Sequence, residues 1–319
     1  MKITTVLLLV LFQLAAAGQV RHIYVAQDGS GNFLTVQTAL NAVTQPNNTP
    51  VIIHIKPGVY REVVVLDSGK NFVSFQGEAG KSTLITYNNH TGKMLPDGKL
   101  ANTRTSASFF IYADDFSAEN IHFENNAGFT AGQAVAVRAD GNRLSFRNCK
   151  FTGFQDVLFL NNRNAKHFFQ SCYIEGTTDF IFGDATAVFD HCAIRSKKNS
   201  HITAASTEKN NPFGFVFYDC KLTSDSATNK VSLGRPWQPY ASVTYINCKM
   251  GKHIIPAGWD NWKNPKNELT ARYAEYHSRG PGANMRARIK WSRQLTKKEL
   301  KNYRIKNILG SWEPYKNKI

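Results

Sequence analysis

Two aspartates, Asp156 and Asp179, stand in apolar and aromatic surroundings, where a charged side chain needs a chemical reason. Each directly precedes a short run of β-forming residues, and a single aspartate at such a place is usually a turn residue. These two, however, lie 23 positions apart, as do Cys149 and Cys172 just before them. The shared spacing places both acids at equivalent points of two consecutive repeats.

Stacked repeats would bring the two carboxyl groups together. Neighbouring strands of a sheet are about 4.8 Å apart, so Asp156 and Asp179 would share one patch of surface. Adjacent carboxylates on a partly apolar surface repel each other and lose hydration, which drives their pKa values apart. One of them then serves as an ionised nucleophile while the other holds a proton as a general acid.

A repeat of β-forming segments, most of them ending in a cysteine, fills the middle of the chain. The segments are residues 121–125, 144–149, 168–172, 188–192, 216–220 and 244–248. Successive cysteines are separated by 23, 20, 28 and 28 residues, with little helix-forming sequence between them. Strand repeats of this length predict an all-β fold, a right-handed parallel β-helix in which each coil buries its face against the next.

The five cysteines occupy the same place in each repeat, which favours a buried ladder of small apolar side chains. Metal binding is disfavoured because no Cys-x-x-Cys pair exists. A disulfide between Cys172 and Cys192 stays open as an alternative, since stacked coils bring such residues within reach.

The ends of a solenoid need covering, because an uncovered terminal repeat exposes its core. A short N-terminal helix is expected to cover one end, with its apolar side formed by Leu34, Val36, Ala39, Leu40 and Val43. A C-terminal helix is expected from Thr296, with Glu299 completing a capping box, and would pack Leu300, Tyr303 and Ile308 against the solenoid. Trp259 and Trp262 mark an aromatic loop region before it.

Charge and targeting signals indicate an extracellular protein with an anionic partner. The 319-residue chain carries a net charge of +16, which suits an acidic polymer. Residues 1–17 have the basic, apolar and small-residue order of a signal peptide, leaving one domain over residues 18–319. Secretion disfavours nucleic acid, and no later segment is apolar enough for a membrane anchor. Asn47 and Asn89 begin glycosylation sequons.

Three further groups have suitable chemistry near the acids. Gln133 precedes Asp156 by one repeat and Gln155 adjoins it; amides donate hydrogen bonds without adding charge, which suits an oxyanion hole. Arg235 has the two-pronged geometry that pairs with a carboxylate. Trp237 offers a flat face for stacking on a sugar ring.

Together these motifs resemble the pectin methylesterase (pectinesterase) family, over residues 28–312. The matching segments are Gly58–Glu62, Gln133–Arg138, Gly153–Asp156, Asp179–Gly183 and Leu233–Trp237. The resemblance implies a right-handed parallel β-helix, in agreement with the repeat. The sequence departs from the family pattern at Val157, where threonine is usual, and at Phe154 and Phe159, where tyrosine is common. These departures bear on subsite preference and remove no catalytic group.

The resemblance also implies roles for individual residues. Asp179 would be the nucleophile, Asp156 the general acid and then base, and Gln133 and Gln155 the oxyanion donors, while Arg235 would keep Asp179 ionised. The sugar-binding groove would contain Thr103, Phe159, Phe182 and Trp237, with Gln133 and Arg235. The implied substrate is methyl-esterified pectin, with no metal or organic cofactor; a protein inhibitor is a further expected partner, and the protein is expected to be a monomer.

Other activities fit the same scaffold. A non-catalytic β-helix that binds acidic polysaccharide would use the carboxylates only to shape its groove, since fold is a poor guide to function. A pectate lyase would need a calcium-binding carboxylate cluster, and a polygalacturonase a different arrangement of acids. An esterase acting on a thioester outside pectin is a more distant alternative.

Overall fold

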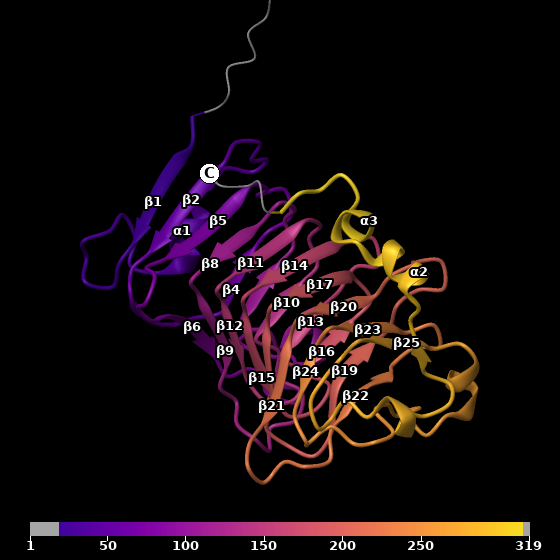
Figure 1. The fold of residues 1–319 in the computed structure, drawn as a ribbon. Helices are drawn as coiled ribbons and strands as arrows, with labels where there is room; N and C mark the ends of the chain where they lie inside the picture. Colours follow the sequence, from indigo (N-terminus) through magenta and orange to yellow (C-terminus); the bar gives the residue numbers. More distant parts are fainter. Residues whose placement is uncertain (1–18, 315–319) are drawn as a thin grey trace, which may run out of the picture.

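The computed structural model describes residues 19–314, so the predicted signal peptide lies outside the described part of the chain. The chain winds through three short strands per coil, and the coils stack from the N-terminal end to the C-terminal end (Figure 1). Three parallel sheets therefore run along the molecule. The predicted right-handed parallel β-helix is confirmed.

The three sheets take their strands from each coil in turn. The first sheet contains β1 (Arg21–Val25), β2 (Val51–Ile55), β5 (Val73–Gly77), β8 (Ser117–Glu119), β11 (Leu144–Arg147), β14 (Lys166–Gln170), β17 (Thr186–Asp190), β20 (Phe215–Tyr218), β23 (Ser242–Ile246), β25 (Arg272–Tyr276) and β26 (Arg293–Gln294). The second sheet contains β3 (Gly58–Arg61), β6 (Thr83–Tyr87), β9 (His122–Asn125), β12 (Lys150–Thr152), β15 (Tyr173–Gly176), β18 (Ala193–Ser196), β21 (Lys221–Ser224) and β24 (Lys249–Met250). The third sheet contains β4 (Val64–Leu66), β7 (Phe109–Ile111), β10 (Val137–Ala139), β13 (Leu158–Leu160), β16 (Ile181–Gly183), β19 (His201–Ala205) and β22 (Ser232–Pro236).

Helices are short and lie mainly near the two ends of the described chain. They are α1 (Val36–Asn41), α2 (Lys297–Leu300), α3 (Ile305–Leu309) and the 3-10 turns η1 (Thr103–Thr105), η2 (Pro265–Leu269), η3 (Met285–Ala287) and η4 (Lys301–Tyr303). The α1 helix packs against β1 and β4 near the N-terminal end. Leu34 was expected on its buried side but precedes the helix and is 57% exposed.

The C-terminal segment covers the outer face of the first sheet. The predicted helix start at Thr296 is confirmed, since Thr296 and Glu299 form a complete capping box at α2. Arg304 then takes an extended conformation, so the segment continues as separate short helices rather than as one. Ile308 and Leu309 of α3 are buried against Phe168 and Val188, and Figure 1 shows α2 and α3 in yellow along this face.

A ladder of stacked aromatic rings forms much of the interior beneath the first sheet. Neighbouring rings are 4.4 to 4.9 Å apart and within 10° of parallel along Phe146, Phe169, Phe189, Phe217 and Tyr245. These residues occupy matching positions in consecutive strands. Aromatic pairs contribute about 0.5–1.5 kcal/mol each beyond their buried area, so the ladder fixes the register of the coils.

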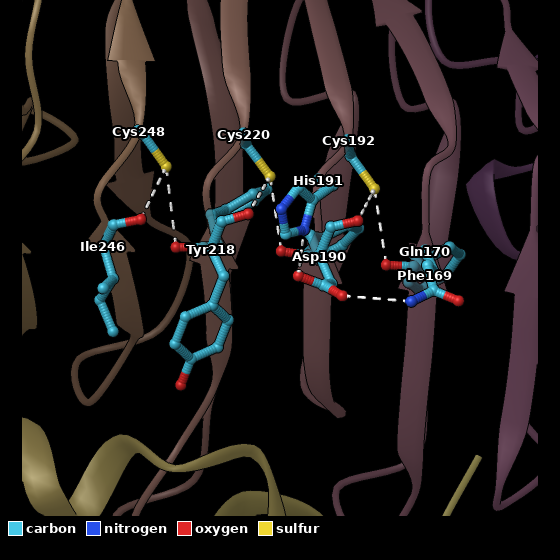
Figure 2. A network of polar contacts seen from close by, with 11 residues as sticks. Phe169, Gln170, Asp190, His191, Cys192, Tyr218, Cys220, Ile246 and Cys248 are labelled. Atoms are coloured by element: carbon cyan, nitrogen blue, oxygen red, sulfur yellow. Dashed lines mark hydrogen bonds and ion pairs between the residues drawn. The ribbon is translucent and has the colours of Figure 1, made fainter. Parts of the chain in front are cut away.

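The five cysteines form the expected second ladder, at the turn between the first and second sheets. All five are free and buried, so the alternative of a Cys172–Cys192 disulfide is not realised in the structure. Figure 2 shows that each thiol of Cys192, Cys220 and Cys248 lies between a carbonyl of its own coil and one of the coil before. The thiols therefore act as small core side chains with weak hydrogen bonds.

One expected repeat unit was assigned to the wrong sheet. Residues 121–125 were grouped with the cysteine-ended segments, but β9 belongs to the second sheet. The counterpart of those segments in this coil is β8, which pairs with β11 in the first sheet. The error arose because β8 is short and polar, whereas β9 has the stronger alternation of apolar residues.

Both sequon asparagines are buried in the folded chain. Asn47 is 3% exposed, and its Nδ2 donates to the carbonyl oxygens of Thr49, at 2.8 Å, and Asn71. Asn89 is 6% exposed. The fold thus offers neither amide to a glycan, and glycosylation stays an untested prediction that this burial disfavours.

The C-terminal end of the solenoid encloses a buried ion pair. Glu275 in β25 accepts two hydrogen bonds from the Arg288 guanidinium, at 2.7 and 3.1 Å. Arg288 also donates to the carbonyl oxygens of Ile255, Pro256 and Gly282. The pair therefore ties the last coils to the turns that close them. Over residues 19–314, no helix has the length and apolarity needed to cross a membrane.

Candidate active site

An outward-facing row of side chains on the third sheet forms the base of the site. Its members occupy matching positions in consecutive strands: Phe110, Arg138, Phe159, Phe182, Ala204 and Arg235. Residues on either side of each point into the core, because side chains alternate along a strand. Within this row, the rings of Phe159 and Phe182 lie between the guanidinium groups of Arg138 and Arg235.

Asp156 and Asp179 lie at equivalent turns, where the chain passes from the second sheet to the third. Each precedes its outward-facing phenylalanine by three residues, and Phe159 and Phe182 are paired in register. Asp156 and Asp179 both adopt the left-handed conformation, with φ of 64° and 51°, which aspartate tolerates better than most residues. The two acids predicted to meet are therefore on adjacent coils, and they are only 8% and 5% exposed.

Arg235 binds Asp179 through both arms of its guanidinium group. Nε and Nη2 donate to the two carboxylate oxygens at 3.0 and 2.6 Å. Arg235 stands two strands away from the coil of Asp179, and the intervening residue in the row is the small Ala204. Gly234 allows the close approach of these strands, because a Cβ there would lie 2.0 Å from the Thr203 hydroxyl. The predicted pairing of Arg235 with Asp179 is present.

The two carboxyl groups differ in their electrostatic surroundings. Burial, followed by the charge of Asp179, raises the pKa of Asp156 well above its ordinary value, and Arg235 and Gln155 oppose this only in part. Burial also raises the pKa of Asp179, but the hydrogen bonds and charge of Arg235 oppose it directly. Asp156 is thus the group that holds a proton more readily, and Asp179 is the group that ionises first.

Gln133 and Gln155 are neighbours on adjacent coils, joined by a parallel β-bridge. Both side chains face the same cleft as the two acids. Gln155 also lowers the pKa of the neighbouring Asp156, although burial outweighs this effect. Two amides side by side, next to a buried acid pair, can donate to one oxygen atom on which negative charge develops.

The cleft above this row has a volume of about 480 Å³. It is lined by Asn102, Thr103, Arg104, Gln133, Gln155, Asp156, Phe159, Asp179, Phe182, Ala204, Arg235, Trp237 and Trp262. Phe159 and Phe182 stack at 4.5 Å in its floor, while Trp237 is 38% exposed and stands over both at 6.4 and 6.0 Å. All the predicted catalytic and groove residues, including Thr103 in η1, therefore meet in one cleft.

Several lining residues were not assigned a role from the sequence. The Trp262 ring lies 3.7 Å from the Arg235 guanidinium carbon and supports the arm that holds Asp179. Sequence reasoning placed Trp262 only in an aromatic loop. Arg104 and Asn102 were missed because they lie on a short 3-10 turn and its cap between strands, outside the repeat; the proximity of Thr103 was the available signal.

The donor set of the cleft suits organic chemistry on a carbonyl group. Over residues 19–314, no group of three or more His, Cys, Asp or Glu side chains is arranged to hold a metal ion. The cleft contains two acidic side chains, and one of them, Asp179, forms an ion pair with Arg235.

Comparison with known proteins agrees with this geometry. The Pectinesterase family model matches residues 22–311. The chain belongs to the pectinesterase family. Among curated relatives, "Pectinesterase 31" of Arabidopsis thaliana is 39% identical over 280 residues, covering 86% of this chain and 88% of that protein. The "Probable pectinesterase/pectinesterase inhibitor" of Brassica napus is 37% identical, but this chain spans only 50% of its length.

Solved structures of pectinesterases share the fold. "Pectin methylesterase from Carrot" superposes with a TM-score of 0.85 at 32% identity, covering 91% of this chain and 94% of that one. A pectin methylesterase crystallised "in complex with hexasaccharide VII" superposes with a TM-score of 0.81 at 29% identity, covering 92% and 98%. The pectinesterase β-helix thus extends over nearly the whole described chain, as the resemblance implied.

Proposed function

We propose that this chain is a secreted hydrolase of the methyl esters of pectin, with Asp179 as the nucleophile and Asp156 as the general acid and base. The observation that carries the proposal is the unequal acid pair. Asp179 is held by both arms of Arg235, whereas Asp156 is buried and resists ionisation. Family membership supports the ester substrate.

The acylation half-reaction follows from these positions. A carboxylate oxygen of Asp179 attacks the ester carbonyl carbon, and negative charge develops on the carbonyl oxygen. The amides of Gln133 and Gln155 donate to that oxygen. The bond to the methoxy group then breaks, and Asp156 transfers its proton to the departing oxygen, so that methanol leaves and an acyl-enzyme on Asp179 remains.

Deacylation reverses these roles. Asp156, now a carboxylate, takes a proton from water while the water oxygen attacks the acyl carbon. The bond to Asp179 breaks, which releases a free uronate and regenerates the carboxylate beside Arg235. Asp156 is protonated again, so the cycle uses one water and yields one methanol and one acid.

The aromatic floor and Trp237 give the cleft a surface for sugar rings. Phe159 and Phe182 are almost fully covered, so the exposed face of Trp237 provides most of the stacking area. Thr103 borders the same cleft. These groups orient the polymer while the acids act on its ester.

The positive charge of the chain supports an anionic extracellular substrate. With a net charge of +16, the protein should bind de-esterified pectin, and added salt should weaken this binding because charges are screened. Secretion, a monomeric state and recognition by a protein inhibitor complete the proposal. Secretion is checked by sequencing the mature N-terminus, which we expect at residue 18.

The decisive experiment is methanol release from esterified pectin by the wild type and by Asp179→Ala. We expect loss of activity by about three orders of magnitude or more, as for removal of other catalytic nucleophiles. Asp219→Ala is the matched control, because Asp219 is also a left-handed aspartate, with φ of 50°, on a different turn. Comparable methanol release by wild type and Asp179→Ala would remove the nucleophile assignment.

The same assay separates the rival activities. A non-catalytic polysaccharide-binding protein would release no methanol although it bound pectin. A lyase would produce unsaturated uronates, and a glycosidase new reducing ends. Methanol release without either product would support the esterase.

A further inference from the structure

A row of exposed positive charges lies on the outer face of the second sheet. The residue after each cysteine of the ladder, together with a residue one coil further, occupies a matching position in consecutive coils: Lys150, Tyr173, Ala193, Lys221, Lys249 and Arg279. The four basic residues among them are exposed, and none lines the cleft of the candidate active site. We call Lys150, Lys221, Lys249 and Arg279 the basic row.

The cysteine ladder determines the direction of these side chains. Cys220 and Cys248 are buried, and Figure 2 shows them on adjacent coils with their thiols pointing the same way. Because side chains alternate along a strand, Lys221 and Lys249 point outward, and the next residue of each strand is buried again. The two lysines therefore stand on neighbouring strands, about 4.8 Å apart at the backbone.

Arg279 extends the basic row by one more coil. Its backbone amide donates to the carbonyl oxygen of Cys248, and its carbonyl oxygen accepts from the amide of Met250, both at 2.8 Å. These are the hydrogen bonds of a further parallel strand, and Arg279 accordingly forms a β-bridge with Lys249. Lys221, Lys249 and Arg279 thus follow one another on three consecutive coils.

The second sheet supplies carboxylate partners to other basic residues on its surface. Arg195 lies in β18 and pairs with Asp225 at 2.6 Å. Lys197 directly follows the same strand and pairs with Glu175 at 3.0 Å. Cations on this face are therefore neutralised locally where the sequence provides an acid beside them.

The basic row has no such partners. Within residues 19–314, no carboxylate oxygen lies within 4.0 Å of the side-chain nitrogens of Lys221, Lys249 or Arg279. Asp219 precedes Lys221 by two residues and is exposed, but the two form no ion pair. In the next two coils the equivalent turn positions hold no acid. Three positive charges thus stand together without a neutralising group.

This arrangement is by itself unfavourable for the folded protein. Ammonium and guanidinium groups on neighbouring strands repel one another, and like charges opposite each other destabilise a sheet. Water and salt screen only part of this repulsion. A bound anion would remove the rest, so the basic row has the electrostatics of a surface that binds an anionic partner.

A linear polymer with regularly spaced carboxylates matches the basic row in charge and in shape. The proposed reaction yields such a polymer, because each hydrolysed ester leaves one free carboxylate on the chain. Lysine and arginine form charge-assisted hydrogen bonds with carboxylates. Lys150 lies three strands before Lys221 and provides a further contact for a chain that follows the row. A fully esterified polymer is neutral and lacks these carboxylates.

We propose that the basic row binds stretches of free-acid pectin outside the cleft and so retains the protein on the polymer. The inference rests on the proposed function, because it takes the anionic product of that reaction as the partner. It also assigns to one surface a binding that the net charge of +16 would otherwise spread over the whole molecule. The cleft then acts on esters while the second sheet holds de-esterified chain.

The test measures binding to polygalacturonate, the fully de-esterified polymer, coupled to beads at low salt. The row variant combines Lys221→Gln, Lys249→Gln and Arg279→Gln. A charge-conserving variant combines Lys221→Arg, Lys249→Arg and Arg279→Lys. Tm and methanol release from a short esterified oligomer are measured for every variant.

The matched control combines Lys297→Gln, Lys298→Gln and Lys301→Gln. These are exposed lysines of α2 and η4, on the segment that covers the first sheet. Their replacement changes the net charge by the same amount as the row variant does. The control therefore separates binding at one surface from binding through net charge.

We expect the row variant to bind polygalacturonate about tenfold more weakly than the wild type, as for the loss of three exposed ion pairs. Its binding should also depend less on added salt, because fewer charges are screened. The charge-conserving variant should bind like the wild type, and the control should stay within about twofold of it. The Tm of the row variant should not fall, since neighbouring like charges have been removed, and its methanol release should stay unchanged.

Other results would overturn the inference. Equal losses in the row variant and the control would show that binding follows net charge, and no loss in the row variant would show that the basic row does not bind the polymer. A row variant that loses more affinity for dextran sulfate than for polygalacturonate would make the row a general polyanion surface, and the assigned partner would be wrong. If the wild type binds polygalacturonate but releases no methanol, the proposed esterase function fails, while the binding result still decides the role of the row.

Discussion

Replacing Arg235 with glutamine tests the central electrostatic argument. Arg235 donates two hydrogen bonds to Asp179, whose side chain is 7% exposed. Glutamine keeps an amide donor near that place but removes the charge. The substitution therefore leaves Asp179 as a buried carboxylate without its cation, which disfavours the ionised form that the reaction needs.

The magnitude follows from the burial of the pair. Removing one partner of a buried ion pair costs about 3–5 kcal/mol. The Arg235 side chain is 22% exposed, so water screens part of the interaction and the lower end, about 3 kcal/mol, applies. Since about 1.4 kcal/mol corresponds to a factor of ten, roughly a hundredfold fewer molecules would hold an ionised Asp179 at acidic pH.

The pH profile of the activity should move to higher pH when Arg235 is replaced with glutamine. Activity requires Asp179 to be ionised, so it is lost as the pH falls through the pKa of Asp179. Without Arg235 that pKa rises, and the acidic limb of the profile moves to higher pH. Burial and Asp179 dominate the raised pKa of Asp156, but Arg235 also lowers it, so the alkaline limb should move in the same direction.

The assay is methanol release as a function of pH for the wild type, Arg235→Gln and Arg235→Lys. Lysine restores a point charge without the two-pronged geometry, so its profile should lie between the other two. A glutamine variant that is slower by the same factor at every pH would refute the reasoning. Arg235 would then act on the substrate and not on the ionisation of Asp179.

Three further predictions concern stability and thiols. Burial raises the pKa of Asp156, so its contribution to stability is full at low pH and is lost as the pH rises through the folded pKa. Asp156→Asn should abolish activity yet raise Tm at neutral pH by roughly 2–5 °C, with no gain below about pH 4; calorimetry showing no gain at neutral pH would contradict this. Arg288→Met should lower the free energy of unfolding in urea by about 3–5 kcal/mol, and adding Glu275→Gln should recover most of it, because the isolated charge is then removed. Thiol titration without reductant should detect none in the folded protein and five after unfolding; three would indicate a Cys172–Cys192 bridge.

The fold could be predicted because its repeat is visible in the residues themselves. A cysteine follows the first-sheet strand in each of five coils, and the spacing of these cysteines gives the number of residues in a coil. The short polar β8 is followed by no cysteine, so the sequence pattern favours residues 121–125 in its place, although they form β9 in the second sheet. Short strands in a solenoid are stabilised by pairing with the coils on either side. Their own residues therefore predict a strand only weakly.

The proposed catalytic groups were equally visible, because Asp156, Asp179 and Arg235 stand in distinctive motifs. Arg104 and Trp262 were not given roles, since each makes its contact with a residue distant in sequence: Arg104 lies 55 positions before Phe159, and Trp262 lies 27 positions after Arg235. Burial of Asn47 was likewise hidden, because it depends on the carbonyl of Asn71 in the next coil.

Because the coils stack one on another, the geometry of the candidate active site and the length of the molecule depend on different coils. Gln133, Asp156, Asp179 and Arg235 come from different coils, but all of these coils lie in the interval between β9 and β23. Coils touch mainly their immediate neighbours, so duplicating a whole unit near β5 would lengthen the molecule without altering any distance at the reacting ester. Loss of the unit between β16 and β22 would instead shift the guanidinium group of Arg235 by one coil relative to Asp179 and so change the geometry of the pair. A lineage of such proteins can therefore change in length at its ends, while its centre keeps a constant number of turns.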